Sequence, residues 1–388
     1  MPNTVYSLAV NGRMAPYQNK LSKYLFLFSK VFEIFIYYNI FRILFISGNC
    51  GTQGLCNMKF DAHVHFNALN EAFIEYGIRN NMRFLSINTD IPFFPPTGEQ
   101  LKTIAKIKKR YPEHIDFAGT FSCDGWGKAG WLETSLDAVR EALDLGAVGI
   151  KVWKNIGMSL KDDSGAYVMI DHPSFEPIMQ YLEDHDIVLL GHNGEPRNCW
   201  LPLEEMTVES DKSYFAAHPE YHMYRHPGMP DYEAQLRARN NMLRKHPNLR
   251  FVGLHLASQE WDTDQVSEFL DEFPNAMVDL AERVCHVQHQ AMDQWQKVRD
   301  FFIKYQDRII YGTDIIVDNS LPDDKLLRLM EDKYRNHHRF FTQADWMTVP
   351  KVNGRFRGLE LPATVVEKIY STNAPKTYTS HQRKAIAS

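Results

Sequence analysis

The sequence predicts a (β/α)8 barrel, an α/β fold, that begins near residue 58. Eight short runs of β-branched and aromatic residues follow that point, and amphipathic stretches lie between most of them. This alternation implies parallel strands joined by right-handed crossovers. Eight such units in roughly 260 residues match the size of a closed barrel. An open doubly wound sheet would need a glycine-rich phosphate turn after its first strand, where this chain instead has FDAHVHF.

The expected strands are spaced along the chain as a barrel requires. They cover 59–66, 83–89, 115–121, 147–153, 187–192, 249–255, 275–281 and 308–314. The clearest helical stretches between them are 99–110, 134–145, 174–184 and 291–305. Long loops follow strand five (193–230) and strand eight (315–362). Both leave the carboxyl ends of their strands, where barrel enzymes place their active sites, so we expect lids or additional elements there.

The first 57 residues differ from the rest and are interpreted as an N-terminal extension to a barrel that covers 58–380. Residues 24–46 are nearly all apolar and long enough for one membrane span. However, Lys30, Glu33 and Arg42 lie within the stretch, and each costs roughly 2.5–3.5 kcal/mol near a helix centre. A lipoprotein signal at Cys50 is a second interpretation. The third, which the Phe-, Ile-, Tyr-, Asn- and Lys-rich composition favours, is translated upstream sequence with Met58 as the true start.

The bulk composition indicates a globular protein with a small-molecule substrate. The chain is 44% hydrophobic and 23% charged, and its net charge is −5. Its scattered basic residues argue against nucleic acid as a partner, while a homo-oligomer remains open. Five cysteines without a CxxC pair indicate reduced thiols rather than a disulfide framework. We expect a cytoplasmic location, or membrane anchoring if 24–46 is a genuine span.

The first strand carries the strongest chemical pattern. Because side chains alternate along a strand, Asp61, His63 and His65 are predicted to share the inward face, with the apolar residues on the other. Two imidazoles one strand repeat apart can bind one metal ion. A single buried histidine would be read as a hydrogen-bonded core residue. Two histidines and an aspartate on one inward face favour a metal site.

Other strands end in matching polar groups. His192 ends the fifth strand, His255 the sixth and Asp314 the eighth, and Lys151 lies near the end of the fourth. One histidine at a strand end is more often hydrogen-bonded than a ligand. Four polar groups at the same end of the barrel, facing the HxH pair, instead indicate one site.

Six segments together resemble the amidohydrolase superfamily, in particular its amidohydrolase 2 branch of decarboxylases, lactonases and related hydrolases. They are DAHVH, GIKVW, LLGHNGEP, VGLHLAS, IIYGTD and VVEKIYSTNAPKTY, and the resemblance covers about 58–378. It implies that His63, His65, His192 and Asp314 bind one divalent metal and that His255 is catalytic. Some members of the branch retain these positions and work without metal.

The implied activity is hydrolysis of a lactone, ester or amide of a small carboxylated molecule. A bound metal lowers the pKa of water from 15.7 to about 7. Asp314 would accept the proton of that water, and His255 would orient or polarise the carbonyl. Zinc is the expected ion, with manganese or iron as alternatives. Two other functions stay open: a non-oxidative decarboxylase (a lyase) with the same ligands, and a non-catalytic metal-binding barrel.

Lys151 leaves the number of ions open. In the two-metal branch of the superfamily, a carboxylated lysine on strand four bridges both ions, and His192 and His255 bind the second. GIKVWKN is more similar to the single-metal branch, where Lys151 would pair with Asp314 or bind a substrate carboxylate. We therefore expect one ion.

Lys151, Glu195, Arg197 and Arg283 are the predicted substrate-binding residues. Glu195 and Arg197 follow strand five closely, and the alternative for them is an ion pair with each other. In the long loop after strand five, prolines interrupt a repeat of three histidines, which predicts lid surface rather than a metal face for His218, His222 and His226.

Overall fold

The structure is a computed structural model that describes residues 58–378. The N-terminal extension predicted for 1–57, with its apolar stretch at 24–46, lies outside the described residues. Among the helices of 58–378, none has the length and apolar character needed to cross a membrane.

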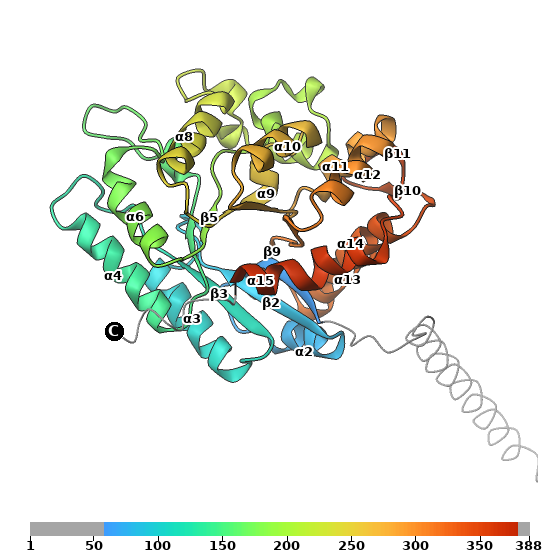
Figure 1. Cartoon of the computed structure of the whole chain (residues 1–388), viewed down its shortest axis with the longest axis horizontal. Helices are drawn as coiled ribbons and strands as arrows, with labels where there is room; N and C mark the ends of the chain where they lie inside the picture. The colour runs from blue at the N-terminus through green and yellow to red at the C-terminus, as the bar shows by residue number, and fades with distance from the viewer. Residues whose placement is uncertain (1–57, 379–388) are drawn as a thin grey trace, which may run out of the picture. The chain divides into compact units, whose positions relative to one another are not determined.

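A ring of parallel strands forms the centre of the described chain (Figure 1). Neighbouring strands pair in sequence order, β7 pairs with β8, and β1 pairs with β9. β8 lies within the predicted eighth strand (308–314), and β9 follows directly after that range. The Ala62 amide of β1 also donates to the Tyr311 carbonyl at 3.0 Å, so this segment joins the first and seventh strands and closes the barrel. The predicted fold is thus confirmed. The strands are β1 (Lys59–Phe66), β2 (Met82–Ile87), β3 (Ile115–Thr120), β4 (Ile150–Val152), β5 (Leu189–Gly191), β6 (Phe251–Gly253), β7 (Ala276–Asp279), β8 (Ile309–Ile310) and β9 (Ile315–Val317).

One amphipathic helix follows each strand of the ring and covers its outer side. In the second of them, for example, Leu101, Ile104 and Ile107 are buried at a spacing of three residues. Polar caps fix some of the starts, as where the Asn70 side chain accepts a hydrogen bond from the Phe73 amide. The barrel helices are α2 (Glu71–Arg79), α3 (Thr97–Arg110), α4 (Trp131–Asp144), α6 (Glu176–Asp184), α8 (Tyr232–Lys245), α10 (Thr263–Glu272), α12 (Trp295–Lys304) and α13 (Asp323–Thr342).

Shorter elements complete the described chain. The stretch predicted as one helix over 291–305 is instead the end of α11 followed, after a break at Gln294, by α12. The additional helices are α5 (Asn155–Met158), α7 (Glu209–Ala217), α9 (Leu254–Ala257), α11 (Val284–Asp293), α14 (Ala363–Glu367) and α15 (Asn373–Tyr378), with a π-helical stretch at Lys368–Thr372.

A bulge in β1 corrects the alternation predicted for that strand. The pairing with β2 slips by one residue between Asp61 and Val64. Such a slip moves the following side chains to the other face. Phe60 and Ala62 pack in a cluster with residues from strands around the ring, and this cluster fills the lower barrel. Asp61 does not share the face of the two histidines, because its carboxylate accepts hydrogen bonds from Thr313 and from Tyr334 of the outer helix α13.

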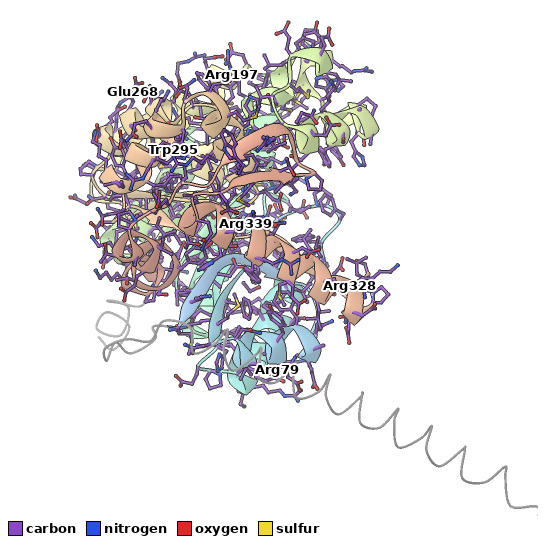
Figure 2. All side chains as sticks on the ribbon, turned by 90° about the vertical axis from the view of Figure 1, so that its right-hand side faces the viewer. Arg79, Arg197, Glu268, Trp295, Arg328 and Arg339 are labelled. Carbon is purple, nitrogen blue, oxygen red and sulfur yellow. The ribbon has the colours of Figure 1, made fainter. Side chains whose placement is uncertain are left out.

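The long connection after β5 forms a small cap, defined here as residues 197–230. It contains α7 and several 3-10 turns, and an apolar cluster of its own formed by Cys199, Met206, Phe215 and Met223. Arg197, where the cap begins, lies at the opposite end of the molecule from Arg79 of α2 (Figure 2). The cap therefore covers the rim where the strands end.

The connection after strand eight contains α13 and an antiparallel hairpin of β10 (Trp346–Val349) and β11 (Val352–Arg357). This hairpin contacts the cap. The Glu209 amide of the cap donates to the Lys351 carbonyl, 3.0 Å away, and the Asn353 side chain donates to the Glu209 carboxylate. The two long connections thus support each other above the barrel.

Candidate metal centre and active site

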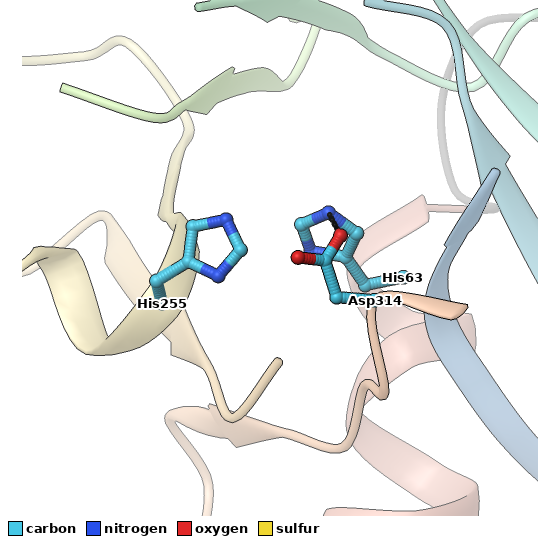
Figure 3. A group of neighbouring side chains, drawn as sticks. All are labelled: His63, His255 and Asp314. Atoms are coloured by element: carbon cyan, nitrogen blue, oxygen red, sulfur yellow. Dashed lines mark ion pairs between the residues drawn. The ribbon is translucent and has the colours of Figure 1, made fainter. Parts of the chain in front are cut away.

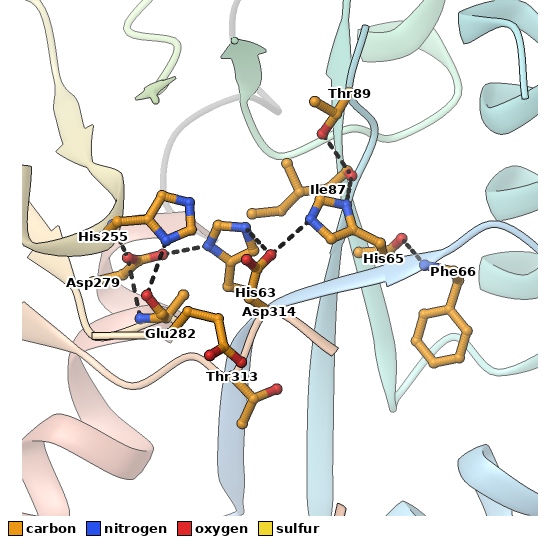
Figure 4. Close-up of polar contacts among 12 residues, drawn as sticks. His63, His65, Phe66, Ile87, Thr89, His255, Asp279, Glu282, Thr313 and Asp314 are labelled. Carbon is orange, nitrogen blue, oxygen red and sulfur yellow. Dashed lines mark hydrogen bonds and ion pairs between the residues drawn. The ribbon is translucent and has the colours of Figure 1, made fainter. Parts of the chain in front are cut away.

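Residues from the first and eighth strands meet at the rim of the barrel. His63 and His65 lie on β1, and Asp314 directly precedes β9. One carboxylate oxygen, Asp314 Oδ1, lies 3.2 Å from His63 Nε2 and 3.0 Å from His65 Nε2 (Figure 4). The amide of Asp314 also donates to the carbonyl of His63 at 2.7 Å. The backbone pairing that closes the barrel therefore also brings these three side chains together.

His192 and His255 complete the cluster from the fifth and sixth strands. The His255 ring centroid lies 4.9 Å from that of His63 and 4.2 Å from that of His192. The imidazole of His255 faces the Asp314 carboxylate and the His63 ring (Figure 3). All five side chains predicted to hold the ion or to perform the chemistry thus lie around one point.

The most compact group of possible ligands differs from the predicted set. His63, His255 and Asp314 each offer a ligand atom within 4.8 Å of the other two. This group contains His255, predicted as a catalytic residue, and omits His65 and His192. The three side chains come from β1 and from the turns that follow β6 and β8.

Three of the imidazoles are held in one tautomer. Each Nδ1 faces an oxygen that only accepts hydrogen bonds: Asp279 Oδ2 for His63 at 2.6 Å, the Ile87 carbonyl for His65 at 2.6 Å, and the Ala281 carbonyl for His255 at 2.9 Å. The proton of the neutral ring therefore lies on Nδ1, and Nε2 presents a lone pair. This is the arrangement by which outer partners orient metal-binding histidines.

Asp279 is a functional candidate that the sequence did not reveal. It is the last residue of β7, fully buried, and it binds both His63 Nδ1 and, at 2.5 Å, the amide of His255. The rule that identified the other strand-end residues would have identified it too. Burial disfavours a charged imidazole, but the Asp279 and Asp314 carboxylates outweigh it and raise the pKa of His63 to about 9. Positive charge at His63 Nε2 is therefore stabilised, whether a proton or a metal ion supplies it.

One unpartnered nitrogen indicates that the residues fit a metal. Within the range 58–378, the buried Nε2 atom of His192 has neither a hydrogen-bond nor an ion-pair partner, whereas His63 Nε2 faces Asp314 Oδ1 at 3.2 Å. A buried polar group left without a partner costs about 1–3 kcal/mol. Imidazole nitrogens together with one carboxylate suit zinc, manganese or iron. The donor atoms thus match the cation that the sequence predicted.

A left-handed turn presents His255 to this cluster. His255, Leu256, Ala257 and Ser258 all have φ between 55° and 58°, and Asp314 has a φ of 62°. Left-handed backbone costs roughly 1–2 kcal/mol per non-glycine residue. The predicted strands over 249–255 and 308–314 are therefore too long: β6 ends at Gly253 and β8 at Ile310, and the chain then turns the two side chains inward.

Hydrogen bonds from α8 hold this turn in place. The Tyr232 hydroxyl donates to the Ser258 carbonyl at 2.5 Å, and the buried Arg239 guanidinium donates to the Ala257 carbonyl and to Gln259. Arg239 forms no ion pair with any residue of the described range, and burial lowers its pKa to about 10. Its charge is therefore compensated by backbone and amide oxygens of the turn.

Replacing Arg239 by methionine is expected to lower the free energy of unfolding by about 1–3 kcal/mol, because the turn carbonyl loses its buried partner. Denaturant unfolding of the metal-free protein measures this. Arg237→Met is the matched control, since Arg237 lies on the same helix with its side chain 65% exposed. Equal stability of the two variants would show that the turn does not depend on Arg239.

A cavity of about 450 Å³ opens above the cluster. His65, His192, His255 and Asp314 line its base, and its walls include Phe94, Trp153, Tyr214, Tyr221 and Met229. A second chamber of about 310 Å³ shares His192, His255 and Asp314 with the first and extends toward Asp211 and Arg283. Both chambers therefore meet at the candidate metal centre.

The predicted substrate-binding residues separate into two groups. Lys151, Glu195 and Arg283 line the chambers. Arg197 lines neither: its guanidinium lies 4.3 Å from the centroid of the Trp261 ring, and its amide donates to Glu260. Arg197 was predicted to bind substrate because it lies close to His192 in the chain. This prediction was wrong, because the 3-10 turn that begins at Arg197 directs its side chain away from the chambers.

The ion pairs of the site also differ from the alternatives weighed from sequence. Glu195 pairs with Lys154, a residue not predicted, rather than with Arg197. Lys151 is 1% exposed and forms no ion pair with Asp314 or any other residue in 58–378. Burial lowers its pKa to about 8, although the Asp314 and Asp279 carboxylates act in the opposite direction.

The three lid histidines have different surroundings. His218 is exposed and His226 lines the main cavity. His222 is buried, and its Nε2 lies 2.8 Å from the Leu201 carbonyl. The prediction of lid surface is therefore wrong for His222, which holds the fold of the cap.

Comparison with known families completes the description. A family model described as amidohydrolase matches residues 125–379. The chain belongs to this family. Its sequence matches no curated protein. This family is the amidohydrolase 2 branch that the sequence motifs resembled, so that expectation is confirmed.

Solved structures similar to this amidohydrolase are distant in sequence. An uncharacterised TIM-barrel protein from Bordetella bronchiseptica is 12% identical, with a TM-score of 0.46, covering 82% of this chain and 97% of its own. A 2,6-dihydroxybenzoate decarboxylase from Rhizobium is 12% identical, with a TM-score of 0.48, covering 83% and 98%. A 4-oxalomesaconate hydratase from Rhodopseudomonas palustris is 10% identical, with a TM-score of 0.46, covering 83% and 95%. These likenesses do not distinguish one reaction from another.

Proposed function

We propose that this amidohydrolase is a metal-dependent hydrolase that cleaves a lactone, ester or amide bond in a small carboxylated molecule. The observation that carries the proposal is the convergence of imidazole Nε2 atoms on the Asp314 carboxylate. His63 Nε2 and His65 Nε2 lie 3.2 and 3.0 Å from the same carboxylate oxygen, and His65, whose pKa is lowered by burial to about 4, directs a lone pair toward it. Lone pairs and a carboxylate repel one another unless a cation lies between them.

His63, His65, His192 and Asp314 are the proposed ligands of one divalent ion. The buried, unpartnered Nε2 atom of His192 belongs to this set and not to the compact group that contains His255, so it supports the proposed set. When bound, such an ion supplies a water of lowered pKa and polarises a carbonyl oxygen. Zinc is the proposed ion, with manganese or iron as the alternatives.

Asp314 is the proposed proton carrier, and His255 is the second proposed catalytic residue. Asp314 accepts the proton of the attacking water and returns it to the leaving group. Burial lowers the pKa of His255 to about 3, and its Nδ1 proton is donated to the Ala281 carbonyl. His255 Nε2 therefore presents a weakly basic lone pair that accepts a hydrogen bond, which differs from the expectation that this residue polarises a carbonyl.

The walls of the main cavity position the substrate in this proposal. The unpaired Lys151 ammonium binds a carboxylate or stabilises the negative charge that develops on the carbonyl oxygen. Phe94, Trp153 and Tyr214 provide apolar surfaces against a planar molecule.

A non-oxidative decarboxylase is the second candidate. It is favoured by the largely apolar walls of the main cavity, which solvate a carboxylate poorly. The same ligands serve both reactions, so the products distinguish them.

Turnover of sugar-acid lactones and aromatic acids in ¹⁸O-labelled water tests the proposal. A hydrolase places one ¹⁸O atom in the product carboxylate, whereas a decarboxylase releases CO2 and takes a solvent hydrogen onto carbon. We expect ¹⁸O incorporation that stops when a chelator removes the metal and returns when zinc is added. Metal-loaded protein that turns over no compound of a broad panel would favour a non-catalytic barrel.

A further inference from the structure

We infer that Arg283 forms an anion subsite beside the candidate metal centre and binds a second carboxylate of the substrate, one that does not react. The inference rests on the proposed function for the position of the reacting group. It adds a substrate class: molecules with two acidic groups on either side of the bond that changes.

The end of β7 directs Arg283 into the second chamber. Glu282 has a φ of 52°, and this left-handed residue turns the chain so that Arg283 becomes the N-cap of α11. The Arg283 side chain is 8% exposed and lines the chamber together with His255 and Asp314. Its Nε has no hydrogen-bond partner in 58–378, and its Nη1 donates only to the Glu282 carbonyl, at 3.3 Å.

The carboxylates around this chamber, other than Asp314, are already paired with other bases. Glu195 pairs with Lys154, and Glu282 pairs with both Lys333 and Lys351. Asp211 lies 3.2 Å from His286 Nε2 and accepts a hydrogen bond from Asn198. Among the described residues, no carboxylate forms an ion pair with Arg283.

Arg283 thus has no direct ion-pair partner in a buried wall. Burial lowers the pKa of its guanidinium, but the carboxylates of Glu260, Asp211 and Glu195 attract the charge from a greater distance and raise it. Glu260 accepts a hydrogen bond from the Arg197 amide and does not line the chamber. A buried charge without a partner is unfavourable, and a ligand anion removes the penalty. The N-terminus of α11 adds to the positive potential at this position.

The shape of the guanidinium selects a carboxylate. Its planar fork matches the two oxygens of a carboxylate and binds them together. Tyr214 and Phe215 line the same chamber and leave room for a small group on an apolar scaffold. Because this chamber and the main cavity share His192, His255 and Asp314, a ligand with its reacting bond at the centre reaches Lys151 at one end and Arg283 at the other.

Calorimetric binding of isophthalate and benzoate to metal-loaded, full-length protein tests the subsite. The two probes share one ring and differ by one carboxylate. We expect wild type to bind isophthalate roughly 10- to 100-fold more tightly than benzoate, as a charge-assisted hydrogen-bond pair predicts. Arg283→Met should bind isophthalate and benzoate with about equal affinity. Arg197 lies outside both chambers, so the control Arg197→Met should keep the preference of wild type.

Arg283→Lys keeps the charge and loses the fork, so its preference should lie between those of wild type and Arg283→Met. This variant also keeps the test decisive if Arg283→Met does not fold. An equal preference in wild type and in the folded Arg283 variants, or no preference in wild type, would overturn the subsite. Acetate is also added to the benzoate complex. If acetate binds there as tightly as the preference for isophthalate over benzoate implies, the subsite takes a separate anion and the assignment of a substrate with two acidic groups is wrong. Metal content and turnover, measured on the same samples, report separately on the proposed function.

Discussion

Replacing Asp314 by asparagine is expected to lower turnover by roughly 10²- to 10⁴-fold, because the change removes the proposed proton acceptor. Asparagine has nearly the same shape, and the Asp314 amide retains its 2.7 Å hydrogen bond to His63. The barrel should therefore close as before, and the circular dichroism spectrum should not change. Steady-state rates on the best substrate of the panel, together with metal content, measure the effect.

Asp318→Asn is the matched control for this prediction. Asp318 lies four residues further along, is exposed, and caps the Ser320 amide rather than contacting the site. Its replacement should leave the rate unchanged. Full activity of Asp314→Asn would remove this residue from the chemistry.

The second large effect is expected on metal affinity. Asp279→Asn should weaken zinc binding by roughly 10- to 100-fold, as replacement of outer partners of metal ligands does. An amide at this position no longer fixes the proton on His63 Nδ1, and it weakens the hydrogen bond that holds the amide of His255. Competition with a chromophoric chelator measures the dissociation constant.

Asp271→Asn provides the comparison for Asp279→Asn, because Asp271 lies on the exposed side of α10 and pairs with Lys304. Its zinc affinity should equal that of wild type. If Asp279→Asn binds zinc as tightly as wild type, the tautomer argument for His63 is wrong.

The fold was predictable because its pattern is repeated eight times. Each strand contributes a short apolar run, and helices such as α3 show buried residues at helical spacing. Strand ends were less accurate, since β6 and β8 stop before His255 and Asp314. The left-handed conformations of these residues follow from tertiary hydrogen bonds, and no glycine marks them in the sequence.

The bulge in β1 shows a second limit of pattern reading. Strict alternation placed Asp61 beside His63, but one extra residue in the strand turns Asp61 toward Thr313 and Tyr334. A period of two contains no information about such a slip unless the partner strand is known.

The convergence of the site was predictable for a geometric reason. Parallel strands of a barrel end at one rim, so His63, His192, His255 and Asp314 had to lie near one another. Side chains in loops do not obey this rule. Arg197 was predicted in the site and lies on Trp261 instead, while Lys154 was not predicted and pairs with Glu195.

Crystallography at a metal absorption edge tests the central claim most directly. The anomalous map of the metal-loaded protein should contain one peak per chain, within bonding distance of Nε2 of His63 and an oxygen of Asp314. His65 and His192 should contact the same peak, and His255 should face it without bonding. A map without a peak among these side chains would contradict the account, and two peaks bridged by Lys151 would replace the single-metal centre with a two-metal one.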